Sequence, residues 1–564
     1  MNGGRVKIIY FFPFVVSLSN HKKTFARGST YTIFQTGSRV KILLVEPDYR
    51  HGSASFIKTV TQPNGLKKRT DESLWYPPIG LLKLATFHRM RGDEVKFVIG
   101  CDKSVFKDTD LYSSDLLWDR IYITTLFTFD WDNVIKTIEF YKKSVGGSIH
   151  KIFVGGIMAS IMPNDIFEET GIQPVVGILN SPQQLGLAGD EEIDLLPPDY
   201  TVIDNRIYAI NDTYYAYATR GCTNKCPWCG VPEIEPTYLK YLDIKPTILK
   251  LRELYGDKPR LKLMDNNILA SSDIERIVED LLELGYGRGQ RTNTKPSKLR
   301  VIDFNQGLDA THITEKTIAL IEKLNIRPMR IAFDRLAYRN NYEKAVRIAY
   351  KHGFKEFSNY MLYNEKDSPR DLHERLMINI RMNEEFRSGT GKASGIIYSY
   401  PMRFAPIRDN SPRHLNRKRD FSPASPDGPY DYFHDARWTK RFTRNIEVIK
   451  GAAHGAISPT PSLASRAIGK DYEEFIANLY MPEELLRNRN KYEERIYPFE
   501  PERPSGTGDV ERFREFILGL LNKQNEAFVE FHAAVAPGSK EAVKQALNTC
   551  KDNEVRKWLK WYLK

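Results

Sequence analysis

The sequence predicts an α/β protein with an N-terminal doubly wound parallel sheet, six further strand–helix units in the centre, and a mainly α-helical C-terminal region. Two observations predict this order. Short apolar runs of strand length alternate with longer runs of helical apolar spacing over roughly the first 400 residues, and only helical patterns follow Trp438. Alternation of this kind indicates βαβ units and parallel sheets. A chain of 564 residues is also too long for a single core.

Residues 1–38 are predicted to be a poorly ordered extension. Arg5 and Lys7 precede an apolar run, Ile8 to Leu18, that superficially resembles a secretory signal. Pro13 interrupts the run, no small-residue cleavage site follows, and a bilayer span takes about 20 apolar residues. We therefore expect a cytoplasmic protein without a membrane partner, and the low cysteine count agrees with a reducing compartment.

The first predicted domain comprises residues 39–200. Its apolar opening run, Val40 to Glu46, is typical of a strand buried in a parallel sheet. Tyr76 to Phe87 begins with two prolines and continues with helical spacing. Further strands are expected at 94–99, 121–125 and 151–154, the last leading into Gly155-Gly156.

The second predicted domain comprises residues 201–405 and follows a proline-rich link. Helices with apolar periodicity, such as the one carrying Ile274, Ile277 and Leu281, separate its strands. Six strands are expected, at 214–219, 260–264, 299–304, 329–333, 354–363 and 395–400.

Residues 406–564 form the third predicted region. Ser411 to Pro429 is rich in proline, serine and aspartate and carries several basic side chains, which we interpret as a solvated loop. Helices are expected at 471–480, from 509 past 521, at 540–547 and at 553–562, with Ser539 as a cap.

Three of the five cysteines lie within eight positions, as Cys222, Cys226 and Cys229. Structural zinc takes four ligands, and no histidine lies between residues 200 and 300 to complete the set. A disulfide would leave an odd thiol. An iron–sulfur cluster is normally bound by thiolates and can leave one iron without a protein ligand, so the spacing favours a cluster, with zinc as the alternative.

With Trp228 just before the last cysteine and a strand-like run ahead of the first, this motif resembles that of the radical S-adenosylmethionine (radical SAM) superfamily. The resemblance implies a partial (β/α)6 TIM barrel and a [4Fe-4S] cluster held by Cys222, Cys226 and Cys229. It also implies that the open iron binds S-adenosylmethionine, with Trp228 beside the adenine. An electron from a flavodoxin- or ferredoxin-like donor would then generate a 5′-deoxyadenosyl radical.

In such a barrel, functional residues lie at the carboxyl ends of the strands. Polar residues that follow the predicted strands are therefore candidate cofactor ligands: Asp265, Asn266, Asn267, Gln306, Asp309, Asp334 and Asn364. The family binds the amino group of S-adenosylmethionine with a Gly-Gly-Glu-like motif after the second strand, where this chain has Asp265-Asn266-Asn267 without the glycines. Each candidate has the alternative interpretation of a helix cap or turn former, and no general acid can be assigned.

The first domain resembles the cobalamin-binding-type domain that precedes many radical SAM cores, through Pro77-Pro78-Ile79-Gly80-Leu81-Leu82 and Gly155-Gly156. The cobalamin signature Asp-x-His-x-x-Gly is absent, since His51 has the wrong spacing, so we do not expect cobalamin. Residues 303–309 and 399–404 resemble radical SAM proteins of bacteria and phages, a resemblance that implies no substrate.

The predicted function is therefore a radical SAM enzyme acting on an unknown substrate. The net charge of +12 suits an anionic substrate or a nucleic acid. Two alternatives remain open. One is an RNA methyl or methylthio transferase, although the helical tail does not resemble the RNA-binding TRAM barrel of tRNA methylthiotransferases. The other is a non-catalytic protein whose cysteines hold zinc or a cluster for structure.

Overall fold

The computed structural model describes most of the chain after residue 38. The described residues are 39–49, 59–61, 67–69, 74–106, 118–145, 148–363, 366–388, 395–404, 407, 437–451, 455–495 and 506–564. They form two compact units. One unit runs to Leu308 and includes Lys316–Arg327, and the other comprises Asp309–Glu315 and Pro328–Lys564. The predicted extension at 1–38, His51 and the loop from Ser411 to Pro429 lie outside the described residues.

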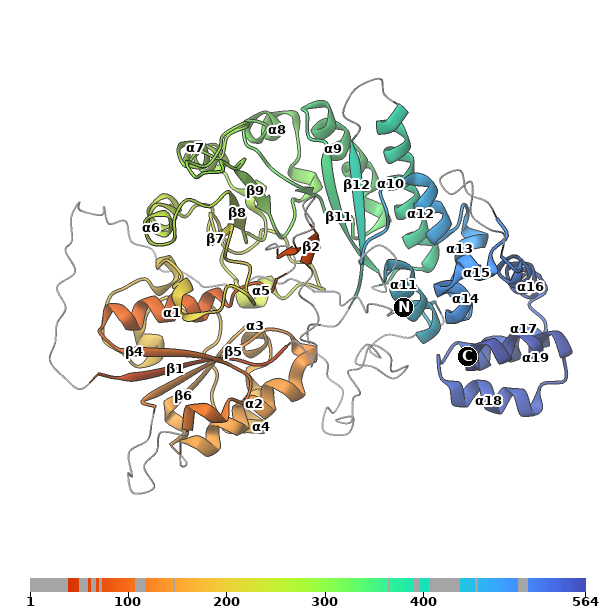
Figure 1. Ribbon diagram of the computed structural model, residues 1–564, viewed down its shortest axis with the longest axis horizontal. Helices are drawn as coiled ribbons and strands as arrows, with labels where there is room; N and C mark the ends of the chain where they lie inside the picture. The colour runs from red at the N-terminus through yellow and green to blue at the C-terminus, as the bar shows by residue number, and fades with distance from the viewer. Residues whose placement is uncertain are drawn as a thin grey trace. The chain divides into compact units, whose positions relative to one another are not determined.

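The first unit begins with a four-stranded parallel sheet in the order β4-β1-β5-β6. Its strands are β1 (Lys41–Glu46), β4 (Glu94–Ile99), β5 (Arg120–Thr125) and β6 (Ile152–Gly156). Its helices are α1 (Ile79–Met90), α2 (Trp131–Ser144), α3 (Ile157–Ile161) and α4 (Pro163–Thr170). Figure 1 shows α1 on one face of the sheet and α2 and α4 on the other. The predicted doubly wound sheet is confirmed. A short antiparallel pair, β2 (Thr59–Thr61) and β3 (Lys67–Arg69), lies between β1 and α1 in the chain.

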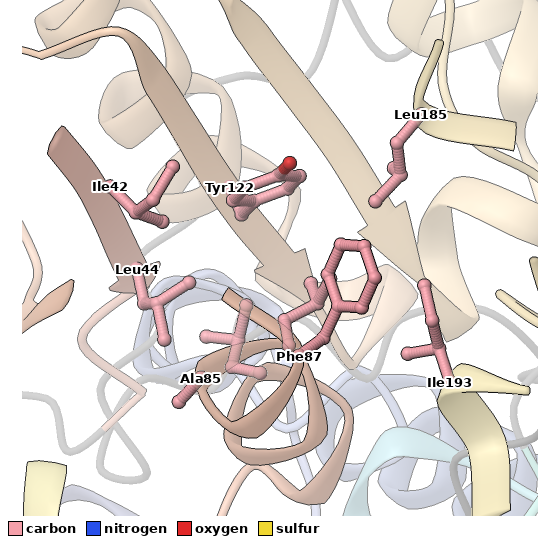
Figure 2. Close-up of a cluster of buried hydrophobic side chains, with 9 residues drawn as sticks. Ile42, Leu44, Ala85, Phe87, Tyr122, Leu185 and Ile193 are labelled. Atoms are coloured by element: carbon pink, nitrogen blue, oxygen red, sulfur yellow. The ribbon is translucent and has the colours of Figure 1, made fainter. Parts of the chain in front are cut away.

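The core beneath α1 explains why the opening run is apolar on both faces. Four consecutive residues of β1, from Ile42 to Val45, are fully buried. Ile42 and Leu44 pack with Ala85 and Phe87 of α1, and Tyr122 of β5 joins the same cluster (Figure 2). Burial on both faces is characteristic of the central strand of a sheet that has helices on either side.

The same unit continues with a parallel sheet in the order β7-β8-β9. Its strands are β7 (Thr213–Ala216), β8 (Arg260–Leu263) and β9 (Val301–Phe304), and its helices are α5 (Val231–Ile234), α6 (Lys245–Tyr255), α7 (Ile274–Glu283) and α8 (Glu315–Ile321). Leu261 and Leu263 are fully buried. The residues between them on β8 point to the opposite face, because side chains alternate along a strand.

The second unit contains the parallel sheet β10-β11-β12. Its strands are β10 (Met329–Arg330), β11 (Glu356–Tyr363) and β12 (Ile396–Arg403), with α9 (Arg339–Lys351) and α10 (Pro369–Ser388) between them in the chain. All six predicted strands are therefore present. Within each of the two three-stranded parallel sheets, every strand pairs with its neighbour in the chain, as in a partial β/α barrel.

Two asparagines on one side of α10, Asn379 and Asn383, form a polar stripe that attaches this helix to its sheet by hydrogen bonds. Asn383 bonds both backbone groups of Ile397 on the edge strand β12, at 2.8 and 3.1 Å. One turn earlier, the Asn379 amide donates to Asn359 Oδ1 and Ser399 Oγ at 3.1 and 2.8 Å. Buried backbone and amide groups need partners, and this stripe supplies them where the apolar pattern of α10 is weak.

Helices dominate the rest of the second unit, as predicted. They are α11 (Lys440–Gly451), α12 (Pro461–Ile468), α13 (Tyr472–Tyr480), α14 (Glu483–Arg487), α15 (Arg489–Tyr492), α16 (Asp509–Lys523), α17 (Glu526–Val535), α18 (Lys540–Thr549) and α19 (Asn553–Leu559). Ser539 caps α18 as expected, because its side chain accepts hydrogen bonds from the backbone of Glu541 and Ala542. No helix in the described ranges has the length and apolar composition needed to cross a bilayer.

Candidate functional site

The three clustered cysteines lie on one loop that follows β7. Cys222, Cys226 and Cys229 are half-buried, and none forms a disulfide. The Cys229 N–H donates to the Cys226 carbonyl at 3.1 Å, which closes a turn between the second and third thiols. At the base of the loop, Arg220 and Leu239 exchange two backbone hydrogen bonds, of 3.0 and 2.8 Å. Arg220 and Leu239 therefore form a stem that holds the two ends of the cysteine loop together.

Gly221 is required immediately before the first cysteine. Its φ of +72° lies in the left-handed region, and a Cβ there would come within 2.7 Å of the Thr237 carbonyl oxygen. Glycine alone adopts this conformation without strain or clash. The Gly221 N–H donates to Glu235 Oε2, so the residue is also held by a buried side chain.

A buried charge cluster supports the stem of the loop. The Arg220 guanidinium donates to both carboxylate oxygens of Asp194, at 2.6 and 2.7 Å, and Lys83 Nζ lies 2.5 Å from Asp194 Oδ1. All three residues are at most 8% exposed. Burial alone would raise the pKa of Asp194, but the two cations hold that pKa below its usual value. The cluster joins α1, the short 3-10 helix Ile193–Leu195 and the cysteine loop.

Asp265, the first residue of the predicted cofactor group, ties the end of β7 to the end of β8. Its Oδ1 accepts hydrogen bonds from Ala218 N at 2.9 Å and from both the backbone and the hydroxyl of Thr219, the latter at 2.7 Å. Its Oδ2 is buried and has no hydrogen-bond partner. Burial raises the pKa of Asp265 to about 6, and the Thr219 and Ala218 hydrogen bonds oppose this rise. The carboxylate is therefore mainly ionised at neutral pH.

Asn267 lies beside the first thiol. Its Nδ2 donates to Cys222 Sγ at 3.6 Å, and its backbone carbonyl accepts from the Tyr238 hydroxyl at 3.0 Å. Its side-chain oxygen is buried without a partner. The structure thus brings Asn267 to the cysteine loop and leaves two acceptors at the end of β8, on Asp265 and Asn267, without donors.

Glu235 is a buried acid of this site that the sequence does not indicate. It is 2% exposed, and nothing in the sequence distinguishes it from the exposed Glu233 two residues earlier. Burial raises the pKa of Glu235 to about 8, an effect opposed by Arg220 and by a hydrogen bond from Asn266. Asn266, the middle residue of the predicted group, therefore forms a hydrogen bond with Glu235 that lowers the pKa of this acid.

This raised pKa predicts a pH-dependent stability. The folded state binds the Glu235 proton more tightly than the unfolded chain does, so this stabilisation is complete below the ordinary pKa of 4.5 and is lost as the pH rises through about 8. Relative to Glu235→Gln, the wild type is expected to lose roughly 3–5 kcal/mol of unfolding free energy between pH 5 and pH 9. Urea denaturation at both pH values measures this difference, with Glu233→Gln as the control. Parallel behaviour of the wild type and Glu235→Gln would contradict it.

A second polar group lies at the end of β9. The Tyr76 hydroxyl, from the segment before α1, donates to Asn305 Oδ1 at 2.7 Å and accepts from Lys262 Nζ at 2.5 Å. Lys262 also lies 3.3 Å from Asp303. The amide nitrogens of Asn305 and of the predicted residue Gln306 are buried without partners. Tyr76 was missed because it is 229 residues away from Asn305 in the chain.

Of the remaining predicted residues, Asp309 and Asp334 have no described contact with the cysteine loop. Asp309 caps a 3-10 turn, accepting from Thr311 N at 2.9 Å. Asp334 Oδ1 accepts from Leu362 N at 3.0 Å, and burial raises its pKa. Both belong to the second unit. Asp309 makes the cap contact of the alternative interpretation, whereas Asp334 joins the end of β10 to the backbone of β11, 28 residues away. Trp228 is half-buried within the loop, and Asn364 lies outside the described residues.

An apolar cavity of about 80 Å³ lies at the carboxyl end of the N-terminal sheet. Gly155 and Gly156 line it, together with Lys83 of α1 and Ile234 of α5. Pockets for drug-sized ligands measure roughly 300–1,000 Å³. This cavity is therefore far too small to contain a corrin ring.

No protein-family model matches the chain, and no curated protein matches it. Among solved structures, it is similar to TsrM of Kitasatospora setae, a radical S-adenosylmethionine methyltransferase with cobalamin and a [4Fe-4S] cluster bound. The TM-score is 0.43 and the identity 11%, over 63% of this chain and 76% of that one.

Two further solved structures resemble the chain. OxsB, a cobalamin-dependent S-adenosylmethionine radical enzyme, gives a TM-score of 0.43 and 12% identity, over 92% of this chain and 76% of its own. HydG, a maturase of the [FeFe]-hydrogenase, gives 0.30 and 13%, over 62% and 80%. All three TM-scores are below 0.5, and we therefore base the functional assignment on the residues of this chain. What the comparisons report is a structural similarity to radical SAM enzymes.

Proposed function

We propose that this protein is a radical SAM enzyme in which Cys222, Cys226 and Cys229 hold a [4Fe-4S] cluster. One observation carries the proposal: three half-buried thiols that form no disulfide share a loop whose first sulfur contacts Asn267, next to two buried acceptors that lack donors. Thiols that are neither oxidised nor fully buried are available as ligands.

The donor set suits a cluster better than a single metal ion. Among the described residues, no group of three His, Cys, Asp or Glu side chains is arranged to hold one metal ion. Zinc would need its sulfurs about 2.3 Å from one point, whereas a cluster spreads its thiolates over different irons. Cys222 Sγ also accepts from the Asn224 N–H at 3.3 Å and from the Asn267 amide. Such hydrogen bonds stabilise a thiolate and adjust the reduction potential of a cluster.

The unpaired acceptors suit an ammonium group. Asp265 is ionised at neutral pH and offers Oδ2, and Asn267 offers Oδ1. S-adenosylmethionine carries an amino group that would satisfy both. A bound cluster would supply, once reduced, the electron for cleavage of the sulfonium of this cofactor. The contribution of the chain is to orient the cofactor through Asp265 and Asn267 and to keep water away from the radical.

Anaerobic reconstitution with iron and sulfide tests the proposal. Reduced protein is expected to give a [4Fe-4S]+ electron paramagnetic resonance signal that changes when S-adenosylmethionine is added, and mass spectrometry is expected to detect 5′-deoxyadenosine. A cluster that ignores S-adenosylmethionine, or zinc without iron and sulfide in the purified protein, would overturn it.

A further inference from the structure

The cavity at the carboxyl end of the N-terminal sheet arises from a change in side-chain size along two paired strands. Tyr122 of β5 is opposite Phe153 of β6, and Thr124 is opposite Gly155. The rings of the first pair stack, with centroids 5.2 Å apart, and Tyr122 packs with the core beneath α1 (Figure 2). Side chains two positions apart lie on the same face of a strand. Thr124 and Gly155 therefore also face α1, and the small side chains of this pair leave the space of about 80 Å³ that we call the Thr124 cavity.

The wall of the Thr124 cavity is mainly apolar. Leu81 and Leu84 of α1 line it, as does Ile193 of the short 3-10 helix. Lys83 is the charged residue of the described lining, and its Nζ lies 2.5 Å from Asp194 Oδ1. Burying a further charge without a partner of its own is costly. The lining therefore favours an uncharged occupant.

One polar atom of the lining lacks a partner. Thr124 is 5% exposed, and its hydroxyl oxygen is buried without a hydrogen bond. The next residue, Thr125, differs: its hydroxyl donates to the Gly155 carbonyl at 2.9 Å and accepts from Ala159 N at 2.8 Å. Buried polar groups are nearly always hydrogen-bonded. The Thr124 hydroxyl therefore indicates a partner that enters the cavity.

The volume limits this partner to a small molecule. An engineered apolar cavity of about 150 Å³ binds benzene or xenon, so the Thr124 cavity suits a body smaller than a benzene ring. Water alone is a poor occupant, because a buried water makes about three hydrogen bonds and most of this wall is apolar. A ligand that matches the site has a compact apolar body and one oxygen.

The cavity also adjoins the residues that hold the cysteine loop. Ile234 of α5 lines the cavity and directly precedes Glu235, whose carboxylate accepts from the Gly221 N–H. On the other side, Lys83 pairs with Asp194, the partner of the arginine in the loop stem. An occupant of the cavity therefore contacts two side chains whose neighbours support the base of the loop.

We propose that the Thr124 cavity binds one small uncharged molecule with a compact apolar body and a single hydroxyl or carbonyl oxygen. The oxygen forms a hydrogen bond with the Thr124 hydroxyl, and the apolar body packs against Leu81, Leu84 and Ile193. A short branched alcohol is the simplest member of this class. The site contains none of the three clustered cysteines, and the inference does not rest on the proposed function.

Methyl NMR of the full chain, labelled at its isoleucine methyl groups, tests the proposal with propan-2-ol and xenon as separate probes. The signals of Ile193 and Ile234, which line the cavity, are expected to shift and to reach saturation with either probe. Affinity for propan-2-ol is expected to be millimolar, because so small a ligand gains little binding free energy. Ile517, in the core of the second unit, is the internal reference and is expected not to shift.

Three variants separate the hydrogen bond from the space. Thr124→Val keeps the shape and removes the hydroxyl, so it is expected to weaken propan-2-ol binding about tenfold, the loss of one hydrogen bond, and to leave xenon binding unchanged. A Cβ on Gly155 would lie 3.6 Å from the Val175 carbonyl oxygen, an ordinary contact. Gly155→Ala is therefore expected to weaken both probes, and Gly155→Val to abolish their binding. Gly519→Ala, where an added Cβ meets nothing within 4 Å, is the matched control.

Several results would overturn the proposal. Shifts that grow without saturation, or that are equal at Ile517, would mean that the probes act as solvents. Equal affinities of the wild type and Thr124→Val for propan-2-ol would remove the role of the hydroxyl. Hydroxocobalamin that shifts the same signals, when neither probe does, would assign the cavity to a larger cofactor. Repeating the titration with Cys222→Ala separates this outcome from that of the proposed function, because binding in the cavity is expected to persist.

Discussion

Cys226→Ala is expected to abolish both cluster incorporation and the formation of 5′-deoxyadenosine. The three thiols share one loop, and its fixed stem cannot bring a replacement ligand, because the other two cysteines lie outside it. Loss of a group on which the chemistry depends reduces turnover by roughly 10³-fold or more. Iron and sulfide analysis after reconstitution, together with mass spectrometry of the cofactor products, measures both losses.

Cys101→Ala and Cys550→Ala are the matched controls. Cys101 is half-buried after β4 and Cys550 is buried after α18, and both lie far from the loop in the sequence. Both variants are expected to retain full iron content and cofactor cleavage. Retention of cluster and activity by Cys226→Ala, or equal losses in the two controls, would refute the assignment of ligands.

Asp194→Ala is expected to destabilise the first unit by about 3–5 kcal/mol, the cost of leaving a buried charge without its partner. Asp194 forms ion pairs with both Arg220 and Lys83, and the change would leave these two cations in a buried environment without this carboxylate. Chemical denaturation followed by tryptophan fluorescence measures the effect. Because Arg220 begins the stem of the cysteine loop, cluster content is expected to fall in parallel.

Two comparisons make this prediction specific. Lys83→Met leaves the Arg220–Asp194 ion pair intact, with no net charge. This variant is expected to lose less unfolding free energy than Asp194→Ala. Asp204→Ala removes an ion pair to Arg206, whose side chain is 75% exposed, and is expected to cost at most about 1 kcal/mol. If Asp194→Ala were no more destabilising than Asp204→Ala, the buried cluster would have no role in stability.

Strand positions could be predicted closely because buried parallel strands carry a local signal. The run 40–46 corresponds to β1, and the predicted strand 354–363 corresponds to β11. In each case, consecutive apolar residues are bounded by polar or turn-forming ones, which fixes the strand within a few positions. The short helices α14 and α15 had no such signal, because they are too short for an amphipathic period.

The candidate site was only partly predictable because much of it depends on contacts between distant segments. The cysteines are close together in the sequence, so their spacing alone indicates them as candidate ligands. Lys83, in contrast, is a charged residue in a mostly apolar helix, and its partner Asp194 is 111 residues away in the chain. The position of a polar residue at the end of a strand likewise does not distinguish a cofactor ligand from a helix cap. Asp309 caps a turn, whereas Asp265 combines a structural contact with an unused oxygen.

The buried charge cluster that supports the cysteine loop determines the order in which parts of the first unit can fold together. Lys83, Asp194 and Arg220 reach one another only after α1 has docked and the chain has been made as far as Arg220. Backbone pairing of Trp75 with Tyr208 imposes the same requirement. During synthesis, Lys83 and Asp194 therefore emerge before the thiols, whereas Glu235 and Asp265, which also hold the base of the loop, are made after them. An iron–sulfur carrier would meet a competent loop only after release of the entire first unit, and expressing the segment from Thr201 onward would give thiols without their scaffold.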